Sequence, residues 1–514
     1  MMKSYRVFIF VFLALLPVLF LRDYTPGNEL RYLSIADEAI KNGSWITFSN
    51  HGEPYADKPP LYFWIIMAGK WLLGEHCMWF LSLFSLIPAF IIVSVMNRWV
   101  AGEVDKKYLL TGELLMLSCG LFVGLSVILR MDMLMCMFIV LSLYTFYKMM
   151  YNEGNMCFNT LLFPIYIFLA VFTKGPIGIL IPLFSTITLL CLTGRIRSIG
   201  RYWGWKTWGI LFIGCLLWFG AVYWEGGKEY LNNLLFHQTI DRAVDSFHHK
   251  APFYYYFVSI WYSLFPWSLL LVGVITVAVC KKMIHTELQK FFFVVIVVTF
   301  LLLSLISSKI EVYMLPAFPF IVYLTIMFLP NFSWNRWFAL SISIPSVIFA
   351  CFLPVFMVLV QQNSSICYLN IQLFYIAASI LTLSGLYSFY ILYKRKQINI
   401  SIRVLFCGLF CSVFVGGWGL SDINAEIGYR ELCAKGVEVA QKYNLEKYYV
   451  WGLYRPENMD VYLHKSIQVV PPDEFVDSGR YKGVFMLPAD KLEELSPSKI
   501  NVYRVGHYAV VVMK

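Results

Sequence analysis

The chain has 514 residues, of which 59% are hydrophobic and 14% are charged. Soluble domains contain about 45–50% apolar and about 25% charged residues, so the composition excludes an ordinary soluble protein and indicates an integral membrane protein. The net charge of +10 is not a nucleic-acid signal. Most of the basic residues lie in short loops between apolar segments, where they set membrane orientation, and no nucleic-acid partner is expected.

The first apolar segment, in MMKSYRVFIFVFLALLPVLF, has the pattern of a signal peptide. Its apolar run is long and no small-x-small cleavage site precedes Asp23, so we interpret it as an uncleaved first span. A span requires about 20 mainly apolar residues, and such segments recur along most of the chain, which predicts thirteen spans. The predicted spans are 5–22, 77–97, 108–128, 131–150, 159–173, 176–194, 207–224, 256–280, 291–307, 310–329, 337–360, 370–393 and 402–420.

Basic residues predict the orientation of these spans. With the N-terminus in the cytoplasm, four basic loops all fall on the cytoplasmic side, as the positive-inside rule requires. An odd number of spans then places the C-terminus in the periplasm. The basic residues are Arg98, Lys106 and Lys107; Arg195, Arg197, Arg201 and Lys206; Lys281, Lys282 and Lys290; and Lys394, Arg395, Lys396 and Arg403.

Two long loops are predicted on the outer face, residues 23–76 and 225–255. The first is too polar to lie in hydrocarbon, so it belongs at a membrane face. Within it, residues 60–74 (PLYFWIIMAGKWLLG) are apolar, short and Trp-rich, which is typical of an interfacial helix. We predict another interfacial helix in residues 226–255.

Four clusters of ionisable residues are predicted at the outer membrane edge. Ionisable groups near a span are costly and usually functional. The clusters are Asn28, Glu29, Arg31 and Tyr32 with Asp57 and Lys58; Arg130 with Asp132; Lys174 in the turn Thr173-Lys174-Gly175-Pro176; and Asp241, Arg242, Asp245, His248, His249 and Lys250 with Lys309 and Tyr313.

Each cluster also has a purely structural interpretation. Arg130 and Asp132 fit an interfacial ion pair, and Lys174 fits a snorkelling anchor. The two histidines fit solvated loop residues, and Asp57-Lys58 before two prolines fits a helix start. All four clusters fall on one predicted face, which favours a functional site.

The composition changes after residue 420, where charge rises and short β-type runs alternate with polar stretches. This pattern predicts a transmembrane part, residues 1–420, followed by a small periplasmic α/β domain, residues 421–514. No glycine-rich phosphate loop occurs, so no nucleotide-binding fold is indicated. The twelve cysteines are scattered, mostly within apolar spans, and we interpret them as small core residues.

The residue types suggest a chemistry. Lysine and arginine at the outer leaflet suit a phosphate or pyrophosphate headgroup, and neighbouring carboxylates suit proton abstraction or a divalent metal. A polyprenyl-phosphate sugar meets both conditions. Its phosphate is a good leaving group that needs cations but no general acid. An incoming hydroxyl would need a base, whereas an incoming phosphate would not.

The chain resembles the superfamily of ArnT and the dolichyl-phosphate-mannose-protein mannosyltransferases, which have the GT-C fold. The closest likeness is to the bacterial 4-amino-4-deoxy-L-arabinose:lipid A transferases. The resemblance covers the whole chain and rests on the order of its motifs. These are Glu29-x-Arg31-Tyr32, Asp57-Lys58-Pro59, Asp132 after the third span, Thr173-Lys174-Gly175, His249-Lys250-Ala251-Pro252-Phe253, and Lys309 with Tyr313.

The resemblance implies site residues and roles. The catalytic candidates are Asn28, Glu29, Asp57 and Asp132. The phosphate-binding candidates are Lys58, Lys250, Arg31, Arg130, Lys174, Lys309 and Tyr313. A divalent metal ion (Zn, Mg or Mn) held by Asp57 and His249 is a further implication.

One position departs from the family pattern. Members usually have Asp-Glu where this chain has Asn28-Glu29. Asn28 hydrogen-bonds but cannot take a proton, so a base would have to be Glu29, Asp132 or Asp57. A different acceptor, or reduced activity, is equally compatible with the change.

The resemblance therefore implies an all-α polytopic membrane protein of the bacterial inner membrane, expected to be a monomer among membrane lipids. It implies transfer of a sugar from a polyprenyl-phosphate donor to lipid A or another envelope glycolipid on the periplasmic face. A protein mannosyltransferase is the alternative enzyme. A lipid or sugar transporter is the alternative from another class, but a transporter would place polar groups or broken helices near the membrane centre. The predicted spans look unbroken and the ionisable residues sit at one edge.

Overall fold

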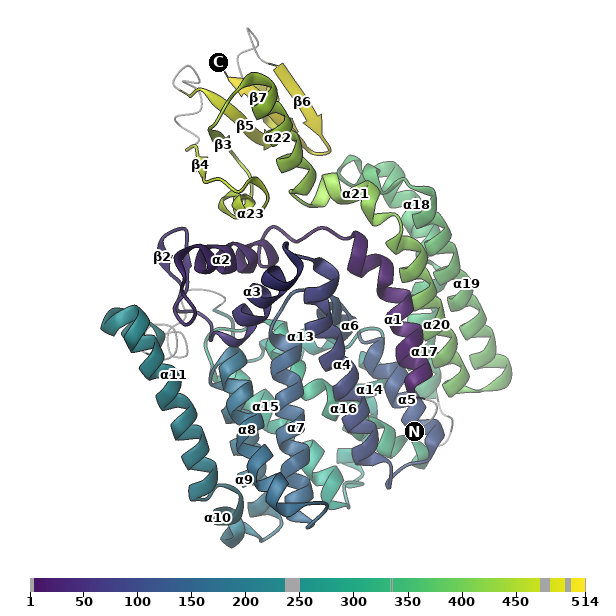
Figure 1. Cartoon of the computed structure of the whole chain (residues 1–514). Helices are drawn as coiled ribbons and strands as arrows, with labels where there is room; N and C mark the ends of the chain where they lie inside the picture. The colour runs from purple at the N-terminus through teal and green to yellow at the C-terminus, as the bar shows by residue number, and fades with distance from the viewer. Residues whose placement is uncertain are drawn as a thin grey trace.

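The computed structural model describes residues 4–235, 250–332, 334, 336–471, 481–494 and 501–513. Figure 1 shows a bundle of helices with a smaller unit, which contains a sheet, above one end. Within the described residues, eight helices are each long and apolar enough to cross a membrane, and two bent pairs raise the number to ten. The chain is therefore a multi-pass membrane protein, as predicted.

The remaining three predicted spans correspond to the shorter apolar helices α1, α9 and α14. The count of thirteen therefore stays a prediction. The unbroken helices of the bundle are α1 (Ser4–Leu21), α4 (Met78–Val100), α7 (Asp132–Met150), α8 (Met156–Lys174), α9 (Ile177–Leu192), α15 (Glu287–Leu305), α16 (Phe318–Phe328), which follows the 3-10 turn η3 (Glu311–Ala317), α19 (Gln372–Arg395) and α20 (Ile398–Gly417).

Three predicted spans are broken, which corrects the expectation of unbroken helices. α5 (Lys106–Leu117) and α6 (Gly120–Val127) meet at 65°. The N–H of Gly120 donates to the carbonyl of Phe265 over 2.7 Å, so the break leaves this backbone donor paired inside the bundle.

The other two breaks have a proline nearby. α13 (Tyr255–Ser263) and α14 (Ser268–Cys280) are separated by a turn that contains Pro266. α17 (Arg336–Ala350) and α18 (Phe352–Gln362) meet at 43°, and Pro354 in the first turn of α18 cannot donate to the carbonyl of Ala350. Composition alone does not show these breaks, because the apolar run continues through each of them.

The first outer loop contains two helices, α2 (Glu29–Asn42) and α3 (Leu61–Leu73), joined by a hairpin of β1 (Ser49–Asn50) and β2 (Glu53–Pro54). The helix predicted over 60–74 is confirmed as α3, whereas α2 was not predicted. α2 is amphipathic and lies across the end of the bundle (Figure 1). Its buried side chains include Leu30, Leu33, Ile35, Ala36 and Ala39.

The span predicted over 207–224 is longer than expected. α11 (Trp205–Asn232) continues past it and bends at Gly227, whose φ is 71° and ψ is −172°. Gly227 therefore separates the span from a second helical segment, which ends at Asn232 and lies where an interfacial helix was predicted; its position at the membrane interface stays a prediction. Asp241, Arg242, Asp245, His248 and His249 lie outside the described residues.

The residues after 420 begin with α21 (Leu420–Ile427) and α22 (Arg430–Tyr443), which precede a mixed sheet with strand order β4-β3-β5-β7-β6. β3 pairs in parallel with β4 and β5, while β7 pairs antiparallel with β5 and β6. The strands are β3 (Tyr448–Val450), β4 (Ile467–Val469), β5 (Gly483–Pro488), β6 (Asn501–Val505) and β7 (Tyr508–Met513).

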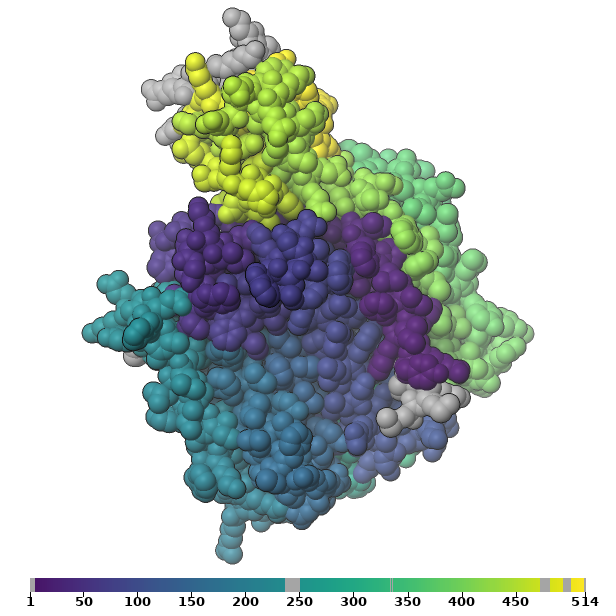
Figure 2. Space-filling view, in the orientation of Figure 1, coloured from purple at the N-terminus to yellow at the C-terminus, as the bar shows by residue number. Residues whose placement is uncertain are grey.

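This C-terminal unit sits on the end of the bundle that carries α2 (Figure 2). Asp23, two residues after the end of α1, makes two of the contacts. Its carboxylate accepts hydrogen bonds from the Tyr462 hydroxyl over 2.5 Å and from the Arg430 N–H over 3.0 Å. On α2, the Ser34 hydroxyl donates to Asp460 over 2.9 Å. Polar contacts thus connect the C-terminal unit to α2, the helix that carries Glu29, Arg31 and Tyr32.

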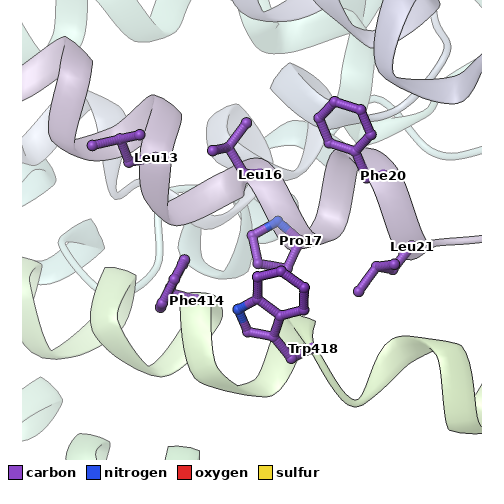
Figure 3. Close-up of a pocket in the computed structure, with 7 residues that line it drawn as sticks. All are labelled: Leu13, Leu16, Pro17, Phe20, Leu21, Phe414 and Trp418. Carbon is purple, nitrogen blue, oxygen red and sulfur yellow. The ribbon is translucent and has the colours of Figure 1, made fainter.

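An apolar groove of about 450 Å³ runs along the outside of the bundle between α1 and α20. Figure 3 shows its walls, which come from Leu13, Leu16, Pro17, Phe20 and Leu21 on one side and Phe414 and Trp418 on the other. Such a lining suits the hydrocarbon chains of membrane lipids.

Candidate functional site

Asp132, Lys174 and Arg130 meet at the end of the bundle. Asp132 is the first residue of α7 and is 1% exposed. Its Oδ1 pairs with Nζ of Lys174, the last residue of α8, and its Oδ2 lies 3.0 Å from Nε of Arg130. Because two cations share one carboxylate, the trio carries a net positive charge and is suited to an anion.

Tyr313 of η3 joins this trio. The Lys174 ammonium lies 4.6 Å from the centroid of its ring, a cation–π geometry. Arg130 is within electrostatic range of both Tyr313 and Tyr32. The predicted cluster of Arg130 with Asp132 and the predicted cluster around Lys174 therefore form one group with Tyr313.

Arg31 connects this group to the outer loop. Its guanidinium lies 5.7 Å from the ring centroids of both Tyr32 and Tyr55, and its Nη2 donates to the Asn28 side-chain oxygen over 3.1 Å. Arg31 and Tyr32 are also within electrostatic range of Asp57. Asp57 and Lys58 are half-buried just ahead of α3, so the first cluster lies beside the others.

Glu29 has a different environment. Its carboxylate is fully buried and forms two hydrogen bonds of 2.7 Å with Arg22. It also accepts the backbone N–H groups of Thr25 over 2.7 Å and Leu129 over 2.8 Å. Burial raises the pKa of Glu29, but these donors outweigh it and hold the pKa below its ordinary value. Such a carboxylate suits an anchor that ties α2 to the segment leading to Asp132.

Lys250 and Lys309 lie on two paired segments. Lys250 forms an antiparallel bridge with Ser308. The Lys309 ammonium is buried and donates to the carbonyls of Ala251 over 3.1 Å and Ile306 over 2.5 Å. These bonds hold the Lys250 segment against the chain that enters η3. The predicted phosphate-binding role of both lysines stays a prediction.

The predicted metal pair is only half described, because His249 lies outside the described residues. Among the residues that are described, no three His, Cys, Asp or Glu side chains come together as ligands. The described residues alone therefore do not form a metal centre, and a metal at Asp57 stays a prediction.

Several residues that shape this site were not predicted from the sequence. Arg22 ends the first apolar segment. It is seven residues from Glu29, and this spacing matches no sequence motif that would predict an ion pair. Tyr55 resembles an ordinary loop aromatic, although its position two residues before Asp57 was a usable signal. Glu225 and Tyr230 of α11 contact the first outer loop from about 180 residues away in the sequence, so no local pattern identifies them.

Comparisons with known sequences give relatives of named function. No protein-family model matches the chain. An uncharacterized protein of Aquifex aeolicus is 27% identical over 335 residues, which cover 63% of this chain and 64% of that protein. The undecaprenyl phosphate-alpha-4-amino-4-deoxy-L-arabinose arabinosyl transferase of Edwardsiella ictaluri is 24% identical over 317 residues, which cover 60% of this chain and 56% of that enzyme. The matches therefore span less than two thirds of these relatives' own length.

Solved structures match the chain over its whole length. ArnT of Cupriavidus metallidurans in the apo state superposes with a TM-score of 0.76 at 17% identity, covering 100% of this chain and 98% of that one. The same enzyme bound to undecaprenyl phosphate gives a TM-score of 0.75 at 17% identity, covering 99% and 98%. These similarities confirm the predicted resemblance to ArnT and its GT-C fold.

Proposed function

We propose that the chain is a glycosyltransferase that moves a sugar from a polyprenyl-phosphate donor to lipid A or another envelope glycolipid. The reaction takes place at the periplasmic face of the bacterial inner membrane. The observation that carries the proposal is the pair of cations, Arg130 and Lys174, that binds the buried carboxylate of Asp132 at one end of the bundle, with Arg31 on the other side of Tyr32. The arabinosyl transferase named above uses an undecaprenyl-phosphate sugar by its name, and the matching fold has been solved with undecaprenyl phosphate.

The group suits the phosphate that leaves the sugar. Transfer breaks the bond between the anomeric carbon and the phosphate oxygen, and the electron pair goes to the phosphate. Cations held in place by Asp132 and Asn28 stabilise this developing charge without reorganising. In the proposal Lys58 and Lys250 also contact the donor phosphate, and no general acid is required.

The acceptor attacks from the opposite side of the anomeric carbon. A hydroxyl acceptor gives up its proton to a carboxylate, for which Asp57 is the most accessible of the predicted residues, being half-buried. An acceptor phosphate is already ionised and needs no base. The buried, fully paired Glu29 suits positioning better than proton transfer.

Mass spectrometry tests the proposal. We expect a deletion strain to lose a sugar from lipid A or another surface glycolipid, and the full chain to restore it. Arg130→Ala and Lys58→Ala should fail to restore it, because a hydrogen bond to a charged group contributes roughly 1.5–3 kcal/mol. A surface glycolipid profile identical in deleted and wild-type cells would reject the proposal. Purified enzyme assayed with and without a chelator tests the predicted divalent metal.

A further inference from the structure

The carboxylate of Glu225, near the end of α11, binds the backbone of the first outer loop. Its Oε1 accepts the N–H of Trp45 over 3.1 Å, of Ile46 over 3.1 Å and of Thr47 over 2.9 Å. It also accepts the Thr47 hydroxyl over 2.8 Å. Three consecutive backbone donors that face one charged carboxylate form a strong, directional attachment.

Tyr230 makes a second attachment a little further along α11. Its hydroxyl accepts the N–H of Phe48 over 3.0 Å and donates to the carbonyl of Tyr55 over 2.7 Å. The Tyr230 ring is buried in a small apolar cluster that includes Ala56 and Trp218. One hydroxyl thus bridges the two ends of the hairpin segment.

Two glycines between these residues fit the arrangement. A Cβ on Gly226 would lie 2.6 Å from the Thr47 methyl carbon, so a side chain there would push the loop away. Gly227 takes a φ of 71°, which other residues rarely adopt, and bends the helix between Glu225 and Tyr230. The sequence Trp224-Glu225-Gly226-Gly227 therefore lets both side chains contact the same loop.

The loop that Glu225 and Tyr230 hold, residues 45–55, continues directly into the proposed phosphate site. The carbonyl bound by Tyr230 belongs to Tyr55, whose ring lies beside the Arg31 guanidinium. Asp57 and Lys58 follow within three residues. Any displacement of α11 relative to the bundle therefore moves Tyr55 and the residues after it.

We propose that Glu225 and Tyr230 are positioning residues that set the donor phosphate site through the loop at residues 45–58. The inference rests on the proposed function and deepens it, because it makes donor binding depend on the position of α11. A purely structural clamp would stabilise the protein but leave donor affinity unchanged. The two roles are therefore separable by experiment.

The test uses the full chain in lipid nanodiscs with undecaprenyl phosphate as the probe. Glu225→Gln keeps one acceptor oxygen but removes the negative charge, so the loop N–H groups lose the charge-assisted part of their bonds, and the new NH2 group cannot accept them. Tyr230→Phe removes both bridging hydrogen bonds while keeping the buried ring. We expect each variant to bind the probe at least about tenfold more weakly than wild type, the loss expected for a charge-assisted bond or two neutral bonds. In a transfer assay the donor KM should rise by a similar factor while kcat changes less.

Glu287→Gln is the matched control, because Glu287 is also a glutamate that accepts hydrogen bonds from a distant segment, here from Tyr151 and Arg195, and lies away from the proposed site. It should bind the probe like wild type. Hydrogen exchange gives an activity-free measurement: Glu225→Gln should speed amide exchange at residues 45–47 and also at residues 55–58. Faster exchange confined to residues 45–47, with probe affinity unchanged in both variants, would overturn the inference. Failure of the wild-type protein to bind undecaprenyl phosphate would instead overturn the proposed function.

Discussion

Asn28 stands where the resemblance to ArnT implies an aspartate, and its contact with Arg31 gives this difference a physical meaning. The amide oxygen accepts one hydrogen bond from the guanidinium over 3.1 Å and leaves the positive charge unneutralised. A carboxylate at this position would pair with Arg31 and compete with a bound phosphate. Asparagine therefore keeps the site more strongly cationic.

The variant Asn28→Asp tests this argument. If the acceptor is a phosphate, which we favour, we expect transfer to fall or stay level, because the new charge weakens donor binding and lies beside an acceptor that is already ionised. If the acceptor is a hydroxyl, the new carboxylate would act as a base, and general-base catalysis typically contributes about 10²–10⁴-fold. Rates for wild type and variant with the identified acceptor decide between the two, and a large gain would show that the acceptor is a hydroxyl.

Glu29 leads to a prediction about stability. Removing one partner of a buried, hydrogen-bonded ion pair typically costs about 3–5 kcal/mol, so Glu29→Gln should strongly lower the melting temperature. Glu438→Gln is the matched control, because Glu438 pairs with Lys435 at the surface, where such pairs contribute about 0–1 kcal/mol. Thermal unfolding in one detergent compares the two. Equal melting temperatures would show that Arg22 finds another partner.

At the scale of elements, helix α2 holds the site together through contacts on several sides. Asp37 receives the Lys70 ammonium from α3 and the imidazole of His76, each over 2.7 Å. Ser34 contacts Asp460 of the C-terminal unit, and Arg31 faces the proposed phosphate site. Because these contacts converge on one short helix, a change in any of them reaches Arg31.

The pH dependence of stability follows from Asp37. Burial raises its pKa, but the bonds to His76 and Lys70 outweigh burial and hold the pKa below the ordinary value of 3.8. A carboxylate with a depressed pKa stabilises the folded state above its unfolded pKa and loses that contribution as pH falls through its folded pKa. Wild type should therefore lose stability relative to Asp37→Asn below about pH 4, as measured by melting temperature against pH. A difference between the two that does not change with pH would contradict this assignment.

The sequence predicted the spans well but the outer elements only in part. A span is recognised by length and apolarity alone, and both survive a bend such as the one between α5 and α6. α2 was missed because its charged residues, including Asp37 and Lys41, hide its apolar face. Asp132, Lys174 and Tyr313 were identified by their position at span edges, and they do meet. Glu225 and Tyr230 were not, because their roles depend on contacts between distant segments, and Arg22 was not, because its pairing with Glu29 follows no recognised sequence pattern.

At the scale of the whole molecule, the polar groups gather at one end of the bundle, beneath the C-terminal unit. Broken spans are typical of transporters. Because three spans of this chain are broken, unbroken helices no longer count against a transporter. A transporter would also place ionisable groups near the membrane centre. The ionisable groups that converge here lie at helix ends instead, since Asp132 begins α7 and Lys174 ends α8.

The membrane orientation of the whole molecule follows from the C-terminal unit and one basic turn. The C-terminal unit contacts α2, so both must lie on the same side of the membrane. The turn between α19 and α20 carries Lys394, Arg395 and Lys396 at the other end of those helices. The positive-inside rule therefore predicts that this turn lies in the cytoplasm and that the C-terminal unit lies in the periplasm.

Two reporters on the full chain test this orientation. Alkaline phosphatase requires disulfides, which form in the periplasm and not in the cytoplasm, so we expect it to be active when fused after Lys514. Green fluorescent protein exported through the general secretory pathway does not fluoresce, so it should be dark after Lys514 and bright when inserted after Lys396. An inactive phosphatase together with bright fluorescence at the C-terminus would reverse the orientation. It would also place Arg31, Asp132 and Lys174 in the cytoplasm, away from any acceptor in the outer leaflet, and so would reject the proposed reaction at the periplasmic face.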